Sequence, residues 1–318
     1  MTENIEIKKT LDHIDFKNIS KHPNILIAAK FWDTERYEAA KVCYKFMRAI
    51  DDLIDERKTE LKTFSCMERQ VLTEKVNNWI NCLDEFKATD PFVEEVVQTV
   101  TKYRIPLKLF HNFARSMIFD INHNGFSSLH EFITYAEGAS VAPASVFIHL
   151  CCLTEKNGRF YPPPFDVTDV ARPCALFSYI VHIIRDFQKD QHENLNYFSA
   201  DILAKNGLNY DDLKEIAYGA PVPELFRNVI REYLGHAREY SEQTLMQIDN
   251  LTSRLDTRYM LSLKIIYALY LQVYNRIDAD RGDFTTEELN PDIEEVKELV
   301  SKIVYEEFSQ ERMVVNRV

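Results

Sequence analysis

Apolar residues recur every three or four positions along most of this chain, which is the period of an amphipathic α-helix. After Asp33 or Thr34, either of which can cap a helix, they form one broad helical stripe: Ala39, Ala40, Cys43, Phe46, Met47, Ile50, Leu53 and Ile54. The period predicts further helices at about 24–31, 66–86, 91–102, 106–121, 128–150, 167–190, 211–219, 223–248, 254–278 and 291–310. No segment alternates convincingly as a strand would. We therefore predict an all-α fold.

Turn-forming residues separate the predicted helices. The stretch from Asn157 to Phe165, with its three consecutive prolines, is the clearest loop. Pro143 should kink the helix that Ser128 opens or end it early. Residues 1–20 are polar with charges of both signs, so we expect a flexible lead before one domain over residues 21–318.

Two short motifs each place a pair of carboxylates on one helix face. Asp51 and Asp55 are four residues apart, and so are Asp186 and Asp190. Either pair alone is typical of a solvated helix surface. Both lie in strongly apolar segments, however, where an unpaired charge is costly. Hard cations such as Mg²⁺ prefer carboxylate oxygens, so the motifs predict one metal site between facing helices.

Composition and charge narrow the classes of partner. The chain has only 7 glycines among 318 residues and contains no GxGxxG or P-loop pattern, so a phosphate must be held in another way. The formal net charge of -12 argues against a nucleic-acid partner. No obligate protein partner is evident.

The cysteines and apolar runs indicate a location. The six cysteines form no CxxC pair and are expected to be reduced thiols. Residues 1–20 do not resemble a signal peptide, and no uncharged run is long enough to span a membrane. We expect a cytoplasmic protein that an apolar substrate can bring transiently to a membrane surface.

Basic residues beside the acidic motifs point to a diphosphate. Metal ions (Mg²⁺, or Mn²⁺ in its place) would bridge its oxygens, while Arg48 and Arg185 donate charge-assisted hydrogen bonds. If the diphosphate leaves an allylic carbon, a dry apolar pocket must protect the carbocation. Candidates for its wall are Tyr44, Phe46, Met47, Tyr135, Phe147, Phe177, Tyr179, Phe187, Tyr197, Tyr267, Tyr270 and Tyr274, although an aromatic at helical spacing is more often plain core.

Three stretches carry a resemblance to a known family. Residues 43–55, 183–190 and 196–199 resemble the squalene/phytoene synthase family in order, spacing and helical setting, and the resemblance extends from about 24 to 277. It implies the isoprenoid synthase fold, a single helical bundle around a central cavity. It also implies that the four aspartates bind Mg²⁺, that Arg48 and Arg185 contact diphosphate, and that Tyr44 and Tyr197 line the reacting centre.

The chain departs from the family pattern around the substrate channel. Asn24-Ile25 stands where the family usually has Ser-Phe, and His182 replaces the usual Asn at the start of the second motif. Where family members commonly carry Arg-x-Tyr, this chain has Leu195-Asn196-Tyr197. We assign Asn24, Tyr135, His182 and Tyr274 to substrate binding, with a satisfied core histidine as the alternative for His182.

The resemblance implies head-to-head condensation of two allylic diphosphates, farnesyl or geranylgeranyl, to a linear C30 or C40 product such as squalene, dehydrosqualene or phytoene. A reductive last step would require NADPH, for which no dinucleotide fingerprint is visible. Two alternatives stay open: a terpene cyclase or prenyltransferase that uses one allylic diphosphate, and a non-catalytic isoprenoid-binding member. The substrate length, the product, the oligomeric state and the role of residues 278–318 are not determined at this level.

Overall fold

The structure is a computed structural model, and it describes residues 2–16, 24–61, 64–88 and 90–315. Helices dominate, which confirms the all-α prediction. The helical segments are α1 (Thr2–His13), α3 (Asn24–Ala29), α4 (Thr34–Glu60), α5 (Cys66–Asp84), α6 (Pro91–Tyr103), α7 (Leu107–Asn122), α8 (Leu129–Ala136), the π-helical turn η1 (Glu137–Val141), α9 (Ala142–Cys151), α10 (Val167–Arg185), α11 (Phe187–His192), α12 (Ala200–Lys205), α13 (Tyr210–Ala217), α14 (Glu224–Thr252), α15 (Thr257–Arg276), α16 (Thr286–Leu289) and α17 (Ile293–Val315).

Local sequence signals explain where several helices begin. The Asp33 side chain accepts the backbone N–H of Arg36 and caps α4, as expected. Ser65 and Glu68 form a reciprocal capping box at α5. Asp90 caps α6, and Pro91 occupies its first turn.

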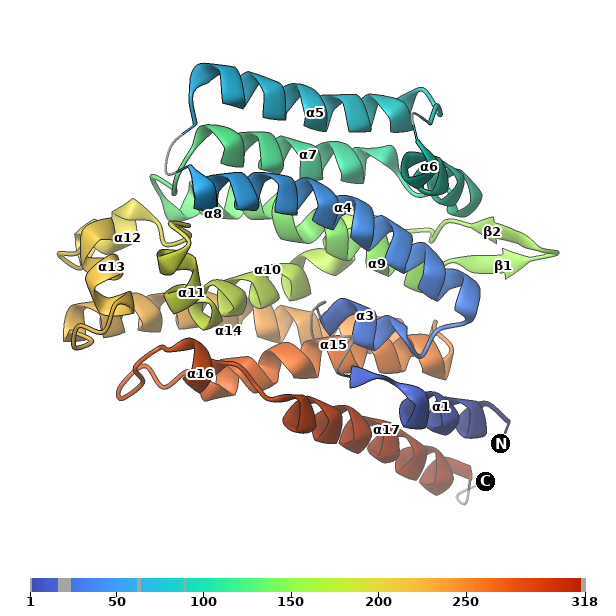
Figure 1. Cartoon of the computed structure of the whole chain (residues 1–318). Coiled ribbons are helices and arrows are strands. Elements are labelled where there is room, and N and C mark those ends of the chain that lie inside the picture. Colours follow the sequence, from blue (N-terminus) through green and yellow to red (C-terminus); the bar gives the residue numbers. More distant parts are fainter. Residues whose placement is uncertain (1, 17–23, 62–63, 89, 316–318) are drawn as a thin grey trace.

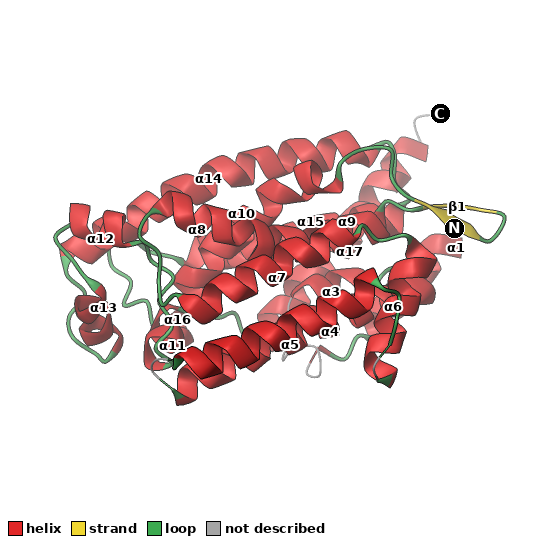
Figure 2. Cartoon of the chain, turned by 90° about the horizontal axis from the view of Figure 1, so that it is seen from above, coloured by secondary structure: helices red, strands yellow, loops and turns green. Residues whose placement is uncertain are grey.

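The helices form layers around α10 (Figure 1). On one side, α4 packs against α7 and α9, and α5 covers α7. On the other side, α14 and α15 pack against α10. The view from above shows α4 and α5 running along one flank and α14 along the other (Figure 2). The two acidic motifs thus come from α4 and from the end of α10 with α11.

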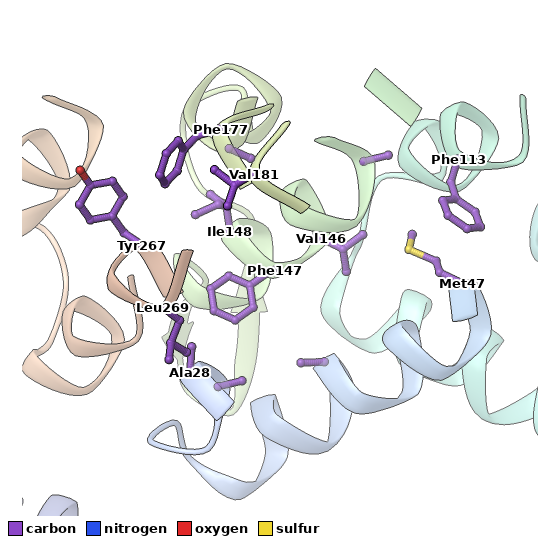
Figure 3. Packing of buried hydrophobic residues seen from close by; sticks show 14 of the residues in the cluster. Ala28, Met47, Phe113, Val146, Phe147, Ile148, Phe177, Val181, Tyr267 and Leu269 are labelled. Atoms are coloured by element: carbon purple, nitrogen blue, oxygen red, sulfur yellow. The ribbon is translucent and has the colours of Figure 1, made fainter. Parts of the chain in front are cut away.

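Interlocking apolar side chains join these layers (Figure 3). Met47 of α4 lies beside Phe113 of α7, and both are nearly fully buried. Phe177 of α10 packs against Tyr267 of α15 with ring centroids 5.7 Å apart. The fully buried Ala28 lets α3 approach α15 closely. Burial on this scale is the main source of the fold's stability.

One π-helical turn interrupts the helix predicted over 128–150. At η1, Gly138 lies so close to Asn112 and Ser116 of α7 that a Cβ would collide with both. The Ser116 hydroxyl donates to the carbonyl oxygen of Tyr135 over 2.7 Å. The interruption therefore begins before Pro143, because the close contact with α7 reshapes the backbone there.

The expectation of a flexible lead at residues 1–20 is wrong for the part that the structure describes. Residues Thr2–His13 form α1, because Ile7, Leu11 and Ile14 provide an apolar face at helical spacing and are buried. That helix packs against α17 (Figure 1). Residues 1 and 17–20 of the predicted lead lie outside the described residues.

The stretch predicted to be a loop begins within a small hairpin. Strand β1 (Thr154–Lys156) pairs antiparallel with β2 (Arg159–Tyr161). Asn157 and Gly158 connect the strands, and both have positive φ. Asn-Gly is a strong signal for such a two-residue turn, and the loop interpretation overlooked it.

Among the described residues, one helix, α10, is long and apolar enough to span a membrane by length and hydropathy. Of that window, 61% is buried inside the protein, as in a core helix. A cytoplasmic location with transient membrane contact therefore stays a prediction.

Candidate active site

The two acidic motifs face one cavity of about 610 Å³. Asp51 and Asp55 reach it from α4, and Asp186 and Asp190 reach it from the junction of α10 with α11. The chain passes directly from one helix to the next at Asp186, whose carbonyl accepts the N–H of Asp190 over 2.8 Å. The sequence prediction that facing helices bring the two pairs together is consistent with this arrangement.

The first acidic pair is partly buried, and the Asp51 side chain is 30% exposed. Burial raises the pKa of Asp51 to about 6, against the opposing charge of Arg48. Burial and the neighbouring Asp51 charge raise the pKa of Asp55 to about 8. Oδ1 of Asp55 is buried and has no hydrogen-bond partner within the described part of the chain. An additional positive charge would therefore stabilise this pair strongly.

Arg48 holds the exposed side of the first motif. Its guanidinium pairs with Asp51 over 2.9 Å and with Asp52 over 2.5 Å. Asp52 does not line the cavity, in keeping with a supporting role.

The second pair is asymmetric. Asp186 is also buried, but the charges and hydrogen bonds of His182 and Arg185 hold its pKa below the usual range. His182 Nε2 lies 2.8 Å from one Asp186 oxygen, and Arg185 Nε lies 2.6 Å from the other. Burial and the Asp186 charge instead raise the pKa of Asp190 well above its usual range. Asp186 is thus already paired with positive charges, while no comparable pairing offsets the burial of Asp190.

Aromatic rings form the wall next to the acids. Tyr135, Tyr179 and Tyr197 form a chain of ring contacts, with centroids of neighbouring rings 6.3 Å apart. Burial raises the pKa of all three phenols well above the usual value, so they stay neutral. Tyr44 and Tyr270 also line the cavity.

Most of the predicted site residues meet at this cavity, with one exception. Its lining includes Asn24, Tyr44, Arg48, Asp51, Asp55, Tyr135, His182, Arg185, Asp186, Asp190 and Tyr197. The placement of Tyr274 at the cavity is wrong, because it points from α15 toward Phe177, with ring centroids 5.8 Å apart. Tyr270, one helical turn earlier, faces the cavity instead.

Only half of the candidate wall residues line the cavity. Tyr44, Met47, Tyr135, Tyr179, Tyr197 and Tyr270 line it, whereas Phe46, Phe147, Phe177, Phe187, Tyr267 and Tyr274 do not. Those six belong to the helix packing, which is the common role of aromatics at helical spacing.

Sequence reasoning missed a buried ion pair behind the first motif. Lys58 of α4 pairs with Asp120 of α7, and their side chains are only 11% and 9% exposed. Both charges act on Asp51 and Asp55, in opposite directions. The signal in the sequence was weak, because Lys58 looks like part of a polar helix end.

The donor set fits Mg²⁺ shared with a ligand. In the described part of the chain, no three His, Cys, Asp or Glu side chains cluster closely enough to hold a metal by themselves. Mg²⁺ usually binds through one or two carboxylates together with substrate phosphates, so it needs no such cluster. The unpaired oxygen of Asp55 and the raised pKa values of Asp51, Asp55 and Asp190 agree with this mode.

Comparisons with known proteins point to one family. The family model for squalene/phytoene synthase matches residues 21–295. A chloroplastic phytoene synthase of Narcissus pseudonarcissus is 20% identical over 255 residues, which are 79% of this chain and 56% of that protein. The 15-cis-phytoene synthase of Synechococcus elongatus is 20% identical over 252 residues, 77% of this chain and 76% of that protein. The chain thus spans little more than half the length of the plant relatives it matches.

Solved structures show the same fold. A dehydrosqualene synthase has a TM-score of 0.69 at 14% identity, covering 96% of this chain and 99% of that one. A squalene synthase of Alicyclobacillus acidocaldarius has a TM-score of 0.63 at 12% identity, covering 96% of each chain. These likenesses confirm the expected helical bundle around a cavity.

Proposed function

The chain belongs to the squalene/phytoene synthase family, and from that premise we propose that it joins two allylic isoprenyl diphosphates head to head in a Mg²⁺-dependent reaction. The observation that carries the proposal is the arrangement of the cavity. Two pairs of aspartates from facing helices, with an arginine beside each pair, border a space lined by tyrosines and aliphatic side chains.

Asp51, Asp55, Asp186 and Asp190 would hold the metal together with the diphosphate. Bound Mg²⁺ would neutralise the negative charge that develops on the departing diphosphate. Arg48 and Arg185 are placed to donate charge-assisted hydrogen bonds to the same oxygens. Each arginine pairs with an aspartate of its own motif. A bound diphosphate would therefore compete with that aspartate for the guanidinium group, which already lies close to the metal ligands.

The rest of the cavity suits the carbocation that remains after ionisation. The faces of Tyr135, Tyr179 and Tyr197 can stabilise positive charge. Their phenols stay neutral, and alanine, isoleucine, leucine and valine side chains form much of the remaining wall, which keeps this part of the cavity poor in charge. The double bond of the second allylic chain would then attack the cationic carbon, and proton loss or reduction would complete a linear C30 or C40 product.

A product assay tests this proposal. Purified protein with Mg²⁺ is given farnesyl or geranylgeranyl diphosphate, with and without NADPH, and products are identified by mass spectrometry. A linear C30 or C40 hydrocarbon supports the proposal, and its dependence on NADPH decides whether the last step is a reduction. A cyclised or singly prenylated product, or binding without turnover, would refute it in favour of one of the alternatives.

Substitutions test the metal assignment. Asp51→Asn and Asp186→Asn should each reduce turnover at least about a hundredfold, because each removes a carboxylate that would hold the Mg²⁺ that neutralises the departing diphosphate. Asp52→Asn is the matched control, since Asp52 neighbours Asp51 but does not line the cavity. Thermal melting checks that each variant folds. Full activity in both motif variants would show that the metal site is misassigned.

A further inference from the structure

The segment that joins α16 to α17 forms part of the cavity wall. Asn290, Pro291, Ile293 and Val296 line the same space as the four aspartates. The residues beyond 278, whose role the sequence left undetermined, therefore contribute directly to the cavity.

This wall is anchored at the acidic end of the cavity. The Gln188 side chain accepts the backbone N–H of Thr286 in α16 over 3.0 Å. Gln188 lies between Asp186 and Asp190 in the second acidic motif. The start of the C-terminal segment is therefore positioned directly by the helix that would bind diphosphate.

The wall is also held firmly from behind. Val300 and Val304 of α17 are fully buried. Glu295 pairs with Arg276 at the end of α15, and Glu307 pairs with Lys264 over 2.5 Å. Such packing fixes which face of α17 is turned toward the cavity.

The helix α17 leads away from the acidic end. It starts beside α16 and runs toward α1 (Figure 1). Ile293 is the first residue of α17, so Val296 lies three residues, or ~4.5 Å, further along the helix axis from the segment that Gln188 anchors at the second acidic motif. That spacing is similar to the length of one extended isoprene unit. Phe16, which precedes the family match at residues 21–295, lines the same cavity, as does Val296, which follows that match.

We propose that Ile293 and Val296 are specificity-determining residues that set the length of the isoprenoid tail accepted by the cavity. The inference rests on the proposed function, because it assumes a tail whose diphosphate is held at the aspartates. A larger side chain at 296 would obstruct the last unit of a C20 tail and leave a C15 tail unobstructed. A larger side chain at 293 would obstruct both.

The test measures binding without turnover. Calorimetry with the full chain and Mg²⁺ gives the dissociation constants of non-ionising thiolo analogues of geranyl, farnesyl and geranylgeranyl diphosphate. Val296→Phe should weaken C20 relative to C15 binding at least tenfold, because even one methylene in an apolar pocket changes affinity by that order. Ile293→Phe should weaken both relative to C10, and Val296→Ala should favour C20.

Val300→Ala is the matched control for Val296→Ala. It removes the same two methyl groups one turn further along, at a position that is fully buried but does not line the cavity. It should leave the C20 to C15 ratio unchanged. Equal weakening of all three analogues by Val296→Phe would overturn the inference while leaving the proposed function intact. Failure of the unmodified chain to bind any of them would overturn the proposed function itself.

Discussion

Replacing Asp55 by asparagine should make the metal-free protein more stable while it abolishes turnover. The Asp55 carboxylate is partly buried beside Asp51, and its buried Oδ1 has no hydrogen-bond partner within the described residues. Ionising it in the folded state is therefore costly. Asparagine keeps nearly the same shape without the charge, and it cannot serve as a carboxylate ligand.

The magnitude follows from the pKa of Asp55, which moves from 3.8 to about 8 on folding, chiefly because of burial. An acid whose pKa is raised on folding favours the folded state below its unfolded pKa, and that contribution is lost as the pH rises through the folded pKa. Between pH 5 and pH 8 the loss is at most ~4 kcal/mol, from about 1.4 kcal/mol per pH unit. Water that reaches the cavity reduces this cost, so we expect ~2 kcal/mol.

Urea unfolding in EDTA, at several pH values from 5 to 8, measures the effect as a difference in unfolding free energy between Asp55→Asn and the unmodified protein. The difference should grow as the pH rises. Replacing EDTA by saturating Mg²⁺ with a non-ionising diphosphate analogue should shrink it, because the variant lacks one carboxylate of the site and binds this pair more weakly. Asp52→Asn is the control, because its side chain is 44% exposed and paired with Arg48. A stability difference that does not change with pH would refute the reasoning.

Three further predictions concern the surroundings of the site. Lys58→Met should destabilise the fold by about 3–5 kcal/mol in urea unfolding, because it leaves the Asp120 charge buried without its partner. The double variant Lys58→Met with Asp120→Leu should recover most of this stability. An equal loss of stability in the single and double variants would contradict the ion-pair account. Gly138→Ala should lower the melting temperature, by several degrees in thermal scans, because its Cβ would collide with α7, and an unchanged melting temperature would argue against that close contact. Tyr270→Ala should weaken the binding of a farnesyl diphosphate analogue about tenfold or more, because Tyr270 lines the cavity. Tyr274→Ala should change the stability of the fold and leave that affinity intact, because Tyr274 packs against Phe177. The reverse pattern would show that the two faces of α15 are misassigned.

Much of the fold could be predicted because helix signals are local. Asp33 and Ser65 cap helices through side chains near in sequence, and apolar periodicity marks the buried faces. The hairpin at Asn157 was missed because its strands are only three residues long, too short for alternation to stand out. The lead was misread because its polar composition hid the apolar face of α1 at Ile7 and Leu11.

The candidate site could be predicted as far as spacing along one helix determines it. The positions of Asp51 and Asp55 follow from a four-residue step. Whether Tyr270 or Tyr274 faces the cavity depends instead on how α15 is rotated against α10. The pairing of Lys58 with Asp120 depends on the approach of α4 to α7, which no local pattern records.

The π-helical turn at residues 137–141 gives this cavity a way to change without any substitution. On an uninterrupted α-helix, a face that includes Tyr135 would continue near positions 142 and 146, yet Pro143 and Ala144 line the cavity instead. The extra residue in the turn has rotated everything after it by about 100°. Loss of one codon in this turn would rotate α9 back and present a different set of side chains to the substrate. A lineage could thus acquire a new cavity wall in one genetic step, through a deletion, while the aspartates stay where they are.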